Sequence, residues 1–401
     1  MTTKAQWTWL VYMAGDNNLE GAGRDDLDEM KRVGSTADVN VVVQFDTEEQ
    51  VTTRYRVGRS KLQTVKKMRG VDAGDPKVLT DFLKWGIQQY PATHYLVDVW
   101  NHGGGWENLP SDFDYDSIRV ARPRRAAKLG RLKRSLFRTT VRKIHRRTPA
   151  ERAIAVDCGS HDYLDNLELR LALARALPRG RKFDVFACDA CLMNMFEIAY
   201  EMKDTARLMV GSEETEPGAG WPYAAILKRL VAKPAMPPAD LGKLIVEEYG
   251  KYFKKSRENA TQSALDLGQI GELGAAIDRL ADALLEDLSA VAGAVSLARD
   301  RAQRFETPEY VDLGDLMRQL STRLPPHSPV TGAAASVLKA LGQGDGSGIV
   351  LGNVTCGSRV ARASGVSIYF PHPEDYSPDY RSLAFSKEGR WNAFLEALFQ
   401  A

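Results

Sequence analysis

Residues 95–105 read YLVDVWNHGGG, an apolar run that ends at a histidine followed by three glycines. A near-continuous apolar run of this length predicts a strand covered on both faces, as in a parallel sheet between helices. The pattern returns at residues 183–191, FDVFACDAC, where a buried strand ends just before Cys191. In parallel sheets, sites form on the loops that leave the carboxyl ends of the strands. We therefore expect His102 and Cys191 to lie close together at such an edge.

Outward from these two segments, apolar strands alternate with amphipathic helices, which indicates an α/β fold with a mostly parallel sheet flanked by helices. Further strands are expected at 7–13, 39–45 and 207–211, a polar-faced hairpin at 52–57 and 62–68, and a late strand at 365–370. Helices are expected at 19–33, 78–89, 165–177, from Cys191 to about 202, 273–297 and 391–399. We place a catalytic α/β core at residues 1–225 and a mostly helical C-terminal region at 226–401, whose late strand completes the core.

Composition excludes several classes of protein. Apolar residues make up 44% of the chain and charged residues 26%, as in soluble globular proteins, and the net charge of +2 indicates no particular partner. Four cysteines are too few for a disulfide scaffold in 401 residues. No apolar stretch is long enough to span a membrane, and the N-terminus lacks the cleavage site of a signal peptide. We expect no membrane association and a cytoplasmic location, or secretion if a leader has been removed.

Positive charge is concentrated in one segment. Residues 119–147 contain thirteen Lys or Arg and no acid, and they lie between the candidate histidine and cysteine. We interpret them as an exposed insertion in the α/β core, at about residues 117–150. Such a segment could bind nucleic acid or another anion by charge. Phe137 is its one aromatic residue, however, which is unusual for single-strand binding. Anion binding stays an alternative function, although nucleic acid is not the partner that we expect.

Cys191 and His102 have the residue types that nucleophilic catalysis needs. A cysteine with an ordinary pKa of about 8.5 is mostly protonated at neutral pH, so attack on a carbonyl requires a base. His102 could take the proton, and the helix predicted directly after Cys191 would favour the thiolate through its N-terminal dipole. Backbone amides of Gly103–Gly105 and of Cys191 could bind an oxyanion. Each residue also has an ordinary alternative role: Cys191 could be a small core residue, and His102 could be a histidine in a turn.

Two other kinds of chemistry fit parts of the pattern. The glycine run also resembles the oxyanion loop of serine esterases, but no serine lies in the G-x-S-x-G motif that these enzymes require. Cys188 and Cys191 form a C-x-x-C pair, which can bind metal or undergo redox reactions. No second such pair accompanies it, and Cys188 is expected in a buried strand. We therefore favour attack by a cysteine on a carbonyl.

Several motifs extend this interpretation to nearly the whole chain: WTWLVYM (7–13), DNNL (16–19), NHGGGW (101–106), DYL (162–164), DACLM (189–193), GSEE (211–214), GW (220–221) and GVSIYFP (365–371). In this order they resemble the clostripain-like cysteine peptidases, family C11, which are relatives of caspases, gingipains and legumain. The resemblance implies a caspase-like fold and a cysteine endopeptidase. It also implies that His102 is the catalytic histidine, Cys191 the nucleophile and Gly103 a neighbour of the oxyanion.

The resemblance further implies protein or peptide substrates that are cut after Arg or Lys. Asp189, two residues before the nucleophile, matches an acid that pairs with the basic side chain of the substrate. Its alternative role is to cap the next helix. A second acid should come from the loop after the strand at 207–211, where Glu213, Glu214 and Glu216 are unranked candidates. We take Glu214 as the candidate for this second substrate-binding acid.

Members of this family are made as one chain and cut between the histidine and the cysteine, often by themselves. The resemblance therefore predicts self-processing within residues 119–147. No cofactor is required, but some members depend on Ca²⁺, and Asp112, Asp114 and Asp116 match part of a calcium-binding loop. Calcium stays an open alternative. So does a non-catalytic caspase-like protein that binds partners, although the presence of both members of the dyad argues against it.

Overall fold

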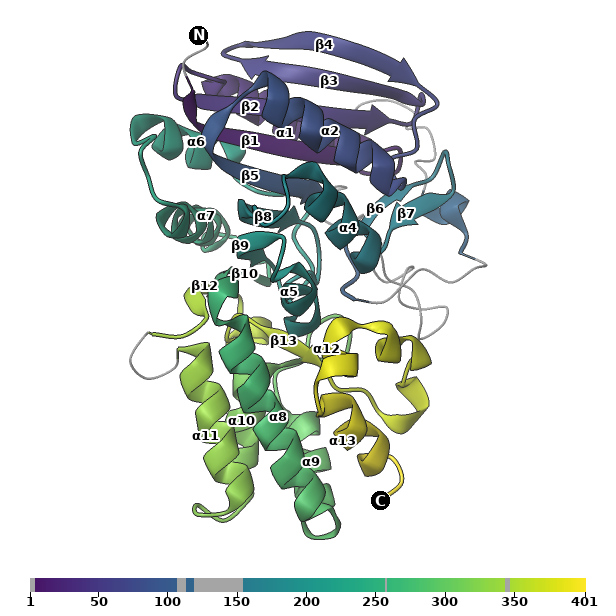
Figure 1. Ribbon diagram of the computed structural model, residues 1–401, viewed down its shortest axis with the longest axis vertical. Helices are drawn as coiled ribbons and strands as arrows, with labels where there is room; N and C mark the ends of the chain where they lie inside the picture. The colour runs from purple at the N-terminus through teal and green to yellow at the C-terminus, as the bar shows by residue number, and fades with distance from the viewer. Residues whose placement is uncertain (1–3, 107–112, 119–153, 257, 343–346) are drawn as a thin grey trace.

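The computed structural model describes residues 4–106, 113–118, 154–256, 258–342 and 347–401. The basic segment 119–147 therefore lies outside the described residues. The rest of the chain forms a large sheet with helices on both faces, and a helical region at one edge of that sheet (Figure 1). Among the described helices, none is both long and apolar enough to cross a membrane.

The large sheet has nine strands: β1 (Ala5–Gly15), β2 (Val39–Thr47), β3 (Val51–Gly58), β4 (Lys61–Arg69), β5 (Ala92–Trp100), β8 (Phe183–Asp189), β9 (Ala206–Gly211), β10 (Ala260–Asp266) and β12 (Val350–Cys356). Their order is β12-β10-β9-β8-β5-β1-β2-β3-β4. The five central strands, from β9 to β2, are parallel, and antiparallel pairs extend the sheet at both edges. This arrangement confirms the mostly parallel sheet predicted from the apolar runs.

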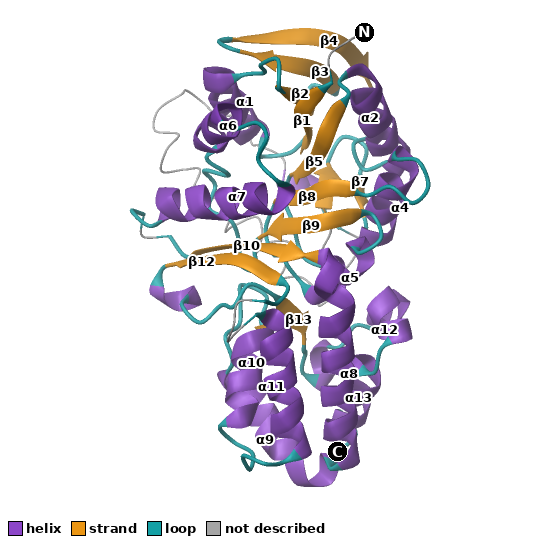
Figure 2. Ribbon diagram, turned by 60° about the vertical axis from the view of Figure 1, so that its left-hand side comes forward, coloured by secondary structure: helices purple, strands orange, loops and turns teal. Residues whose placement is uncertain are grey.

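Central strands are apolar along their length because helices cover both faces. Leu10 and Val11 of β1 point to opposite faces, and neither is exposed. Figure 2 shows one layer of helices on each side of the sheet. One layer consists of α1 (Glu20–Val33), α6 (Tyr223–Ala232) and α7 (Pro238–Phe253). The other consists of α2 (Pro76–Gln89), α4 (Asn166–Ala176) and α5 (Phe196–Met202).

Beyond α7, strands β10 and β12 extend the large sheet, and the other elements form the helical region (Figure 1). The helices of this region are α8 (Ile270–Glu286), α9 (Leu288–Arg301), α10 (Leu313–Ser321), α11 (Pro329–Leu341), α12 (Ala384–Glu388) and α13 (Trp391–Leu398). Two small sheets pair β6 (Ile154–Asp157) with β7 (Asp162–Leu164), and β11 (Tyr310–Asp312) with β13 (Ser367–Tyr369). Short 3-10 helices are η1 (Tyr115–Ile118), η2 (Leu267–Gln269), η3 (Ser358–Val360), η4 (Pro373–Asp375) and η5 (Pro378–Ser382).

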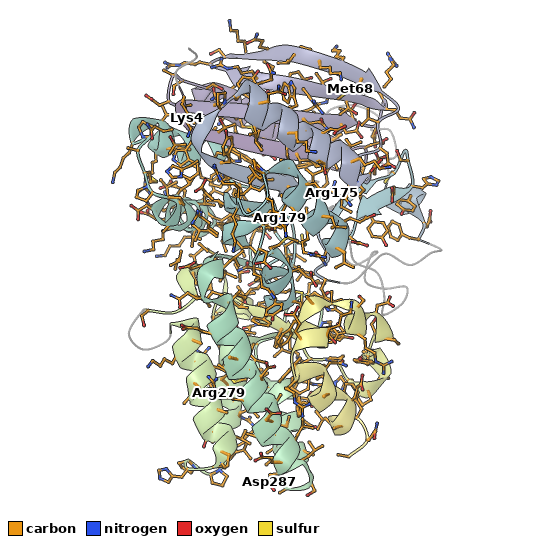
Figure 3. All side chains as sticks on the ribbon, in the orientation of Figure 1. Lys4, Met68, Arg175, Arg179, Arg279 and Asp287 are labelled. Carbon is orange, nitrogen blue, oxygen red and sulfur yellow. The ribbon has the colours of Figure 1, made fainter. Side chains whose placement is uncertain are left out.

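Two sequence predictions in the C-terminal region need correction. The single helix expected at 273–297 is two helices, α8 and α9, which meet at Asp287, at the tip of the helical region (Figure 3). The late strand expected at 365–370 forms as β13, but it pairs with β11 and not with the large sheet. That sheet is completed by β10 and β12, two strands that the sequence analysis did not predict.

Candidate active site

Parallel pairing of β5 with β8 brings the two candidate loops together. Trp100 is paired in register with Asp189, so His102 and Cys191 each lie two residues beyond the same level of the sheet. The loops then touch: a Cβ atom added at Gly103 would lie 2.3 Å from the carbonyl oxygen of Cys191. Only glycine allows so close an approach of the two backbones. The structure therefore brings together the loops of the predicted dyad.

Asparagine side chains fix the strand ends around these loops. Asn17, after β1, donates from Nδ2 to the carbonyl oxygens of Ala14 at 3.1 Å and of Val156 at 2.8 Å. Asn101, after β5, donates to the same carbonyl of Ala14 and accepts from the backbone N–H of Val156 at 3.0 Å. Both asparagines are buried. These bonds link the ends of β1 and β5 to β6, so the loop that carries His102 has a defined path.

The two candidate catalytic residues are completely buried in this structure. Burial lowers the pKa of His102 to about 3. Burial also raises the pKa of the Cys191 thiol, and the nearby carboxylate of Glu216 raises it further. The sulfur accepts a hydrogen bond from the backbone N–H of Glu216 at 3.2 Å, while His102 Nε2 lies 2.7 Å from Asn18 Oδ1. Because attack requires a thiolate, the structure represents a neutral, covered state of the pair.

A segment of the C-terminal region, residues 304–310, contacts the loop after β5, which carries His102, and the loop after β9. The hydroxyl of Tyr310 donates to the carbonyl of Gly104 at 2.9 Å, in the loop that follows β5. The backbone N–H of Glu306 donates to Glu214 at 3.1 Å, in the loop that follows β9. The helical region is therefore in direct contact with the candidate site, which helps to explain why the dyad is buried.

The helix predicted to begin directly after Cys191 begins later. Helix α5 starts at Phe196, because the intervening residues pair with the loop after β9. Leu192 has a left-handed φ of 61°, and its N–H donates to the carbonyl of Glu214 at 3.2 Å. The prediction that this helix's dipole favours the Cys191 thiolate is therefore wrong. For the same reason Asp189 is not the cap of α5.

Four acids from four different elements form a buried cluster next to Cys191: Asp26 of α1, Asp98 of β5, Asp189 of β8 and Glu216 of the loop after β9. The hydroxyl of Tyr223 lies between two of them, 3.1 Å from Asp98 Oδ2 and 2.9 Å from Asp189 Oδ2. Glu216 Oε1 lies 3.5 Å from Trp221 Nε1, and the charge of Asp189 acts on the Glu216 carboxyl group. Within the described part of the chain, none of the four acids forms an ion pair with a basic residue.

Burial raises the pKa of each acid in this cluster. The negative charge of Asp189 raises the pKa of Asp26, Asp98 and Glu216 further. The raised pKa values favour protonated carboxyl groups when no cation is bound, and the ionised cluster would compensate the charge of a cation that enters.

The structure separates the three glutamates that the sequence left unranked. Glu214, the candidate for the second substrate-binding acid, faces the C-terminal region, where its Oε2 lies 3.9 Å from Arg359. Glu213 also turns to that region and accepts a backbone hydrogen bond from Gly365. Glu216 is the glutamate that contacts Asp189. The sequence analysis did not identify Asp26 or Asp98 as site residues. An aspartate within the apolar strand β5 was nevertheless a signal of a functional role for Asp98.

A second group of buried acids lies at the ends of β1, β2 and β6. Asp16, Asp46 and Asp157 place carboxylate oxygens within 4.8 Å of one another and could hold a metal ion. Oxygen ligands of this kind suit Ca²⁺. Of the calcium candidates predicted from the sequence, Asp112 lies outside the described residues and Asp114 is exposed. Calcium binding stays a prediction.

A histidine and a cysteine on touching loops at the ends of adjacent parallel strands, beside an acid cluster, form an arrangement that suits the chemistry of a cysteine peptidase. The sequence profile of the clostripain family, peptidase family C11, matches residues 11–117 and 142–397, and the chain belongs to this family. It is 24% identical to clostripain from Hathewaya histolytica over 258 residues. That match covers 56% of this chain and 42% of the length of clostripain.

Two solved structures share the fold. A secreted C11 cysteine protease from Bacteroides thetaiotaomicron, in complex with an irreversible peptide inhibitor, is 20% identical with a TM-score of 0.67, and the match covers 97% of this chain and 100% of that one. An inactive zymogen C11 protease from Parabacteroides distasonis is 21% identical with a TM-score of 0.66, over 96% and 99% of the two chains. The caspase-like α/β fold is thereby confirmed. Because the first relative is secreted, the comparisons lend no support to the cytoplasmic location expected from the sequence.

All four cysteines are buried and none forms a disulfide, so the native, uncut chain should react slowly with a thiol reagent at neutral pH. Ellman's reagent should titrate four thiols only after unfolding in guanidinium chloride. Peptide mass spectrometry after brief alkylation identifies the thiol that reacts first, and Cys191→Ala provides the control for that assignment. Rapid alkylation of Cys191 in the uncut native chain would contradict the covered state described above.

Proposed function

We propose that the protein is an endopeptidase that uses His102 and Cys191 as a catalytic dyad and cuts after Arg or Lys. The contact between their two loops at Gly103 supports the dyad. The cluster of four buried acids beside Cys191, with no basic partner in the described chain, supports a basic side chain before the scissile bond. This cluster is the observation that carries the proposal.

In the uncovered site, His102 takes the proton of the Cys191 thiol, and the thiolate attacks the carbonyl carbon of the scissile bond. A C–S bond forms, and the backbone amides of Gly103 and Cys191 are the donors that we assign to the oxyanion. The imidazolium then protonates the leaving amine as the C–N bond breaks. Water attacks the acyl-enzyme, His102 takes a proton from it, and the product carboxylate leaves as the thiol is restored.

Asp189 and Glu216 are the acids that we assign to the basic side chain of the substrate. Glu216 is fixed next to the nucleophile, since its backbone N–H donates to the sulfur of Cys191. Asp189 lies two residues before that cysteine, and its negative charge raises the pKa of Glu216. A guanidinium group can donate to two carboxylates at once, which favours Arg over Lys in this geometry. Asp98 and Tyr223 lie next to this pair. The hydroxyl of Tyr223 bonds to the carboxyl groups of Asp98 and Asp189 and so fixes the orientation of Asp189.

Reporter peptides with Arg, Lys, Asp or Asn before the scissile bond test this assignment. Glu216→Gln should lower kcat/KM for the Arg reporter about 10- to 100-fold, because a hydrogen bond to a charged group contributes about 1.5–3 kcal/mol. Glu214→Gln is the matched comparison and should have a much smaller effect, because its carboxylate faces Arg359. A wild-type preference for Asp or Asn would keep the peptidase and overturn the acid pocket.

The proposed specificity also makes substrate binding depend on pH. The raised pKa values mean that the empty cluster keeps protons, whereas a bound guanidinium favours the ionised carboxyl groups. Binding should therefore release protons, and KM for the Arg reporter should fall as pH rises, until pH exceeds the pKa values of the empty cluster. Calorimetric titration with a reversible arginine-based inhibitor, in buffers of different ionisation heat, counts the protons. Binding heats that do not depend on the buffer would disprove the linkage.

We further propose that the enzyme cuts itself within residues 119–147, where thirteen Lys or Arg offer sites of the preferred kind. The buried dyad of the uncut chain supports this proposal, since a latent precursor requires a covered site. Wild type should convert to two fragments on incubation, whereas Cys191→Ala should stay at 44.4 kDa. Tagged wild-type enzyme added to the variant distinguishes cleavage within one molecule from cleavage between molecules. Identical fragments from both proteins would exclude self-processing.

A further inference from the structure

The loop between β1 and α1 supplies a polar side chain to the candidate catalytic histidine. Asn18 lies three residues after the end of β1, is half-buried, and places its Oδ1 2.7 Å from Nε2 of His102. This distance is that of a normal hydrogen bond. We propose that Asn18 is a positioning residue, whose oxygen holds the hydrogen on Nε2 and so directs Nδ1 to take the proton of Cys191. The inference rests on the proposed dyad.

The chemistry of imidazole explains why one acceptor decides which nitrogen is the base. Neutral histidine carries one N–H, and an acceptor oxygen at Nε2 favours the form with the hydrogen on that nitrogen. The lone pair is then on Nδ1. After His102 has taken the thiol proton, the bond from Nε2 to Asn18 becomes charge-assisted and stabilises the imidazolium. No other group needs to be protonated or deprotonated for this step.

An amide is suited to this position because it is neutral. Burial alone lowers the pKa of His102 to about 3, so the imidazole is neutral in the covered chain. A carboxylate in place of the Asn18 amide would raise that pKa and keep the ring protonated at higher pH. Among the described residues, other titratable groups near this position include Cys191, Tyr310 and Asp16.

The oxygen of Asn18 is held in place by contacts that do not involve the histidine. The backbone N–H of Asn18 donates to the carbonyl of Ile118 in η1 at 2.9 Å. Its neighbour Asn17 is fully buried, bonds to Ala14 and Val156, and accepts from the backbone N–H of Leu19 at 2.9 Å. The loop after β1 is therefore fixed to β6 by bonds that do not involve His102. A positioning residue requires such independent support.

Two variants separate positioning from mere structural support. Asn18→Ala removes the acceptor and should lower kcat about 10- to 100-fold with little change in KM, the range for removal of a partner that orients a histidine. Asn18→Asp keeps the acceptor but adds a negative charge. It should move the acid limb of the pH profile of kcat/KM upward by about one unit or more, while activity above that limb recovers towards wild type.

The variants are first processed by affinity-tagged wild-type enzyme, which is then removed, so that a defect in self-processing does not obscure the kinetics. Asn40→Ala is the matched control, because Asn40 is a half-buried asparagine at the opposite end of the sheet, bonded to Thr8. It should keep wild-type kinetics. Thermal unfolding of all three variants checks that each one folds.

The outcomes distinguish this inference from the dyad on which it rests. If Cys191→Ala or His102→Ala keeps full activity, the dyad is wrong and the positioning role is overturned with it. If both are inactive while Asn18→Ala keeps wild-type kcat, or Asn18→Asp keeps the wild-type pH profile, the dyad survives and the role of Asn18 is overturned. A loss of kcat that Asn18→Asp restores at high pH supports the inference.

Discussion

Parallel pairing between β5 and β8 is the interaction on which the rest of the site depends. Each strand contributes one loop, and the register that aligns Trp100 with Asp189 sets the height of both loops above the sheet. A slip of one residue would turn every side chain of one strand to the opposite face, so the apolar packing on both sides fixes this register. Glycine at position 103 then lets the loops touch. The geometry of the site is thus a consequence of sheet packing and not of the loops alone.

The acid cluster shows how a functional site departs from the rules that govern the surrounding core. Four carboxyl groups without a basic partner in the described chain are costly in a water-excluded interior, and apolar residues would stabilise the same space better. The protein limits this cost through protonation and through donors such as Tyr223 and Trp100. A buried group of acids in a well-packed α/β core is therefore a candidate site for a ligand of opposite charge.

Sequence reasoning identified the central strands and the two loops of the site because apolar runs and strand-end motifs are local patterns. It failed where the outcome depends on tertiary contacts. Strands β10 and β12 lack the long apolar run of the central strands, and they pair at the edge of an existing sheet. Helix α5 begins late because Leu192 bonds to a loop distant in sequence. Glu214 and Glu216 could not be ranked, because the path of their loop decides which carboxyl group faces Asp189 and which faces Arg359.

The interval between β5 and β8 has a consequence for how the enzyme is assembled. These adjacent strands come from opposite sides of the basic segment, so a break there would leave the histidine on one polypeptide and the cysteine on another. The two pieces would be joined by the central ladder of the sheet, with four strands on the cysteine-bearing side and five on the other. Such an enzyme is a split protein, in which neither half has a complete active site. Its activity would then depend on the association of the two pieces. Dissociation would abolish activity, and only reassociation of the two pieces would restore it.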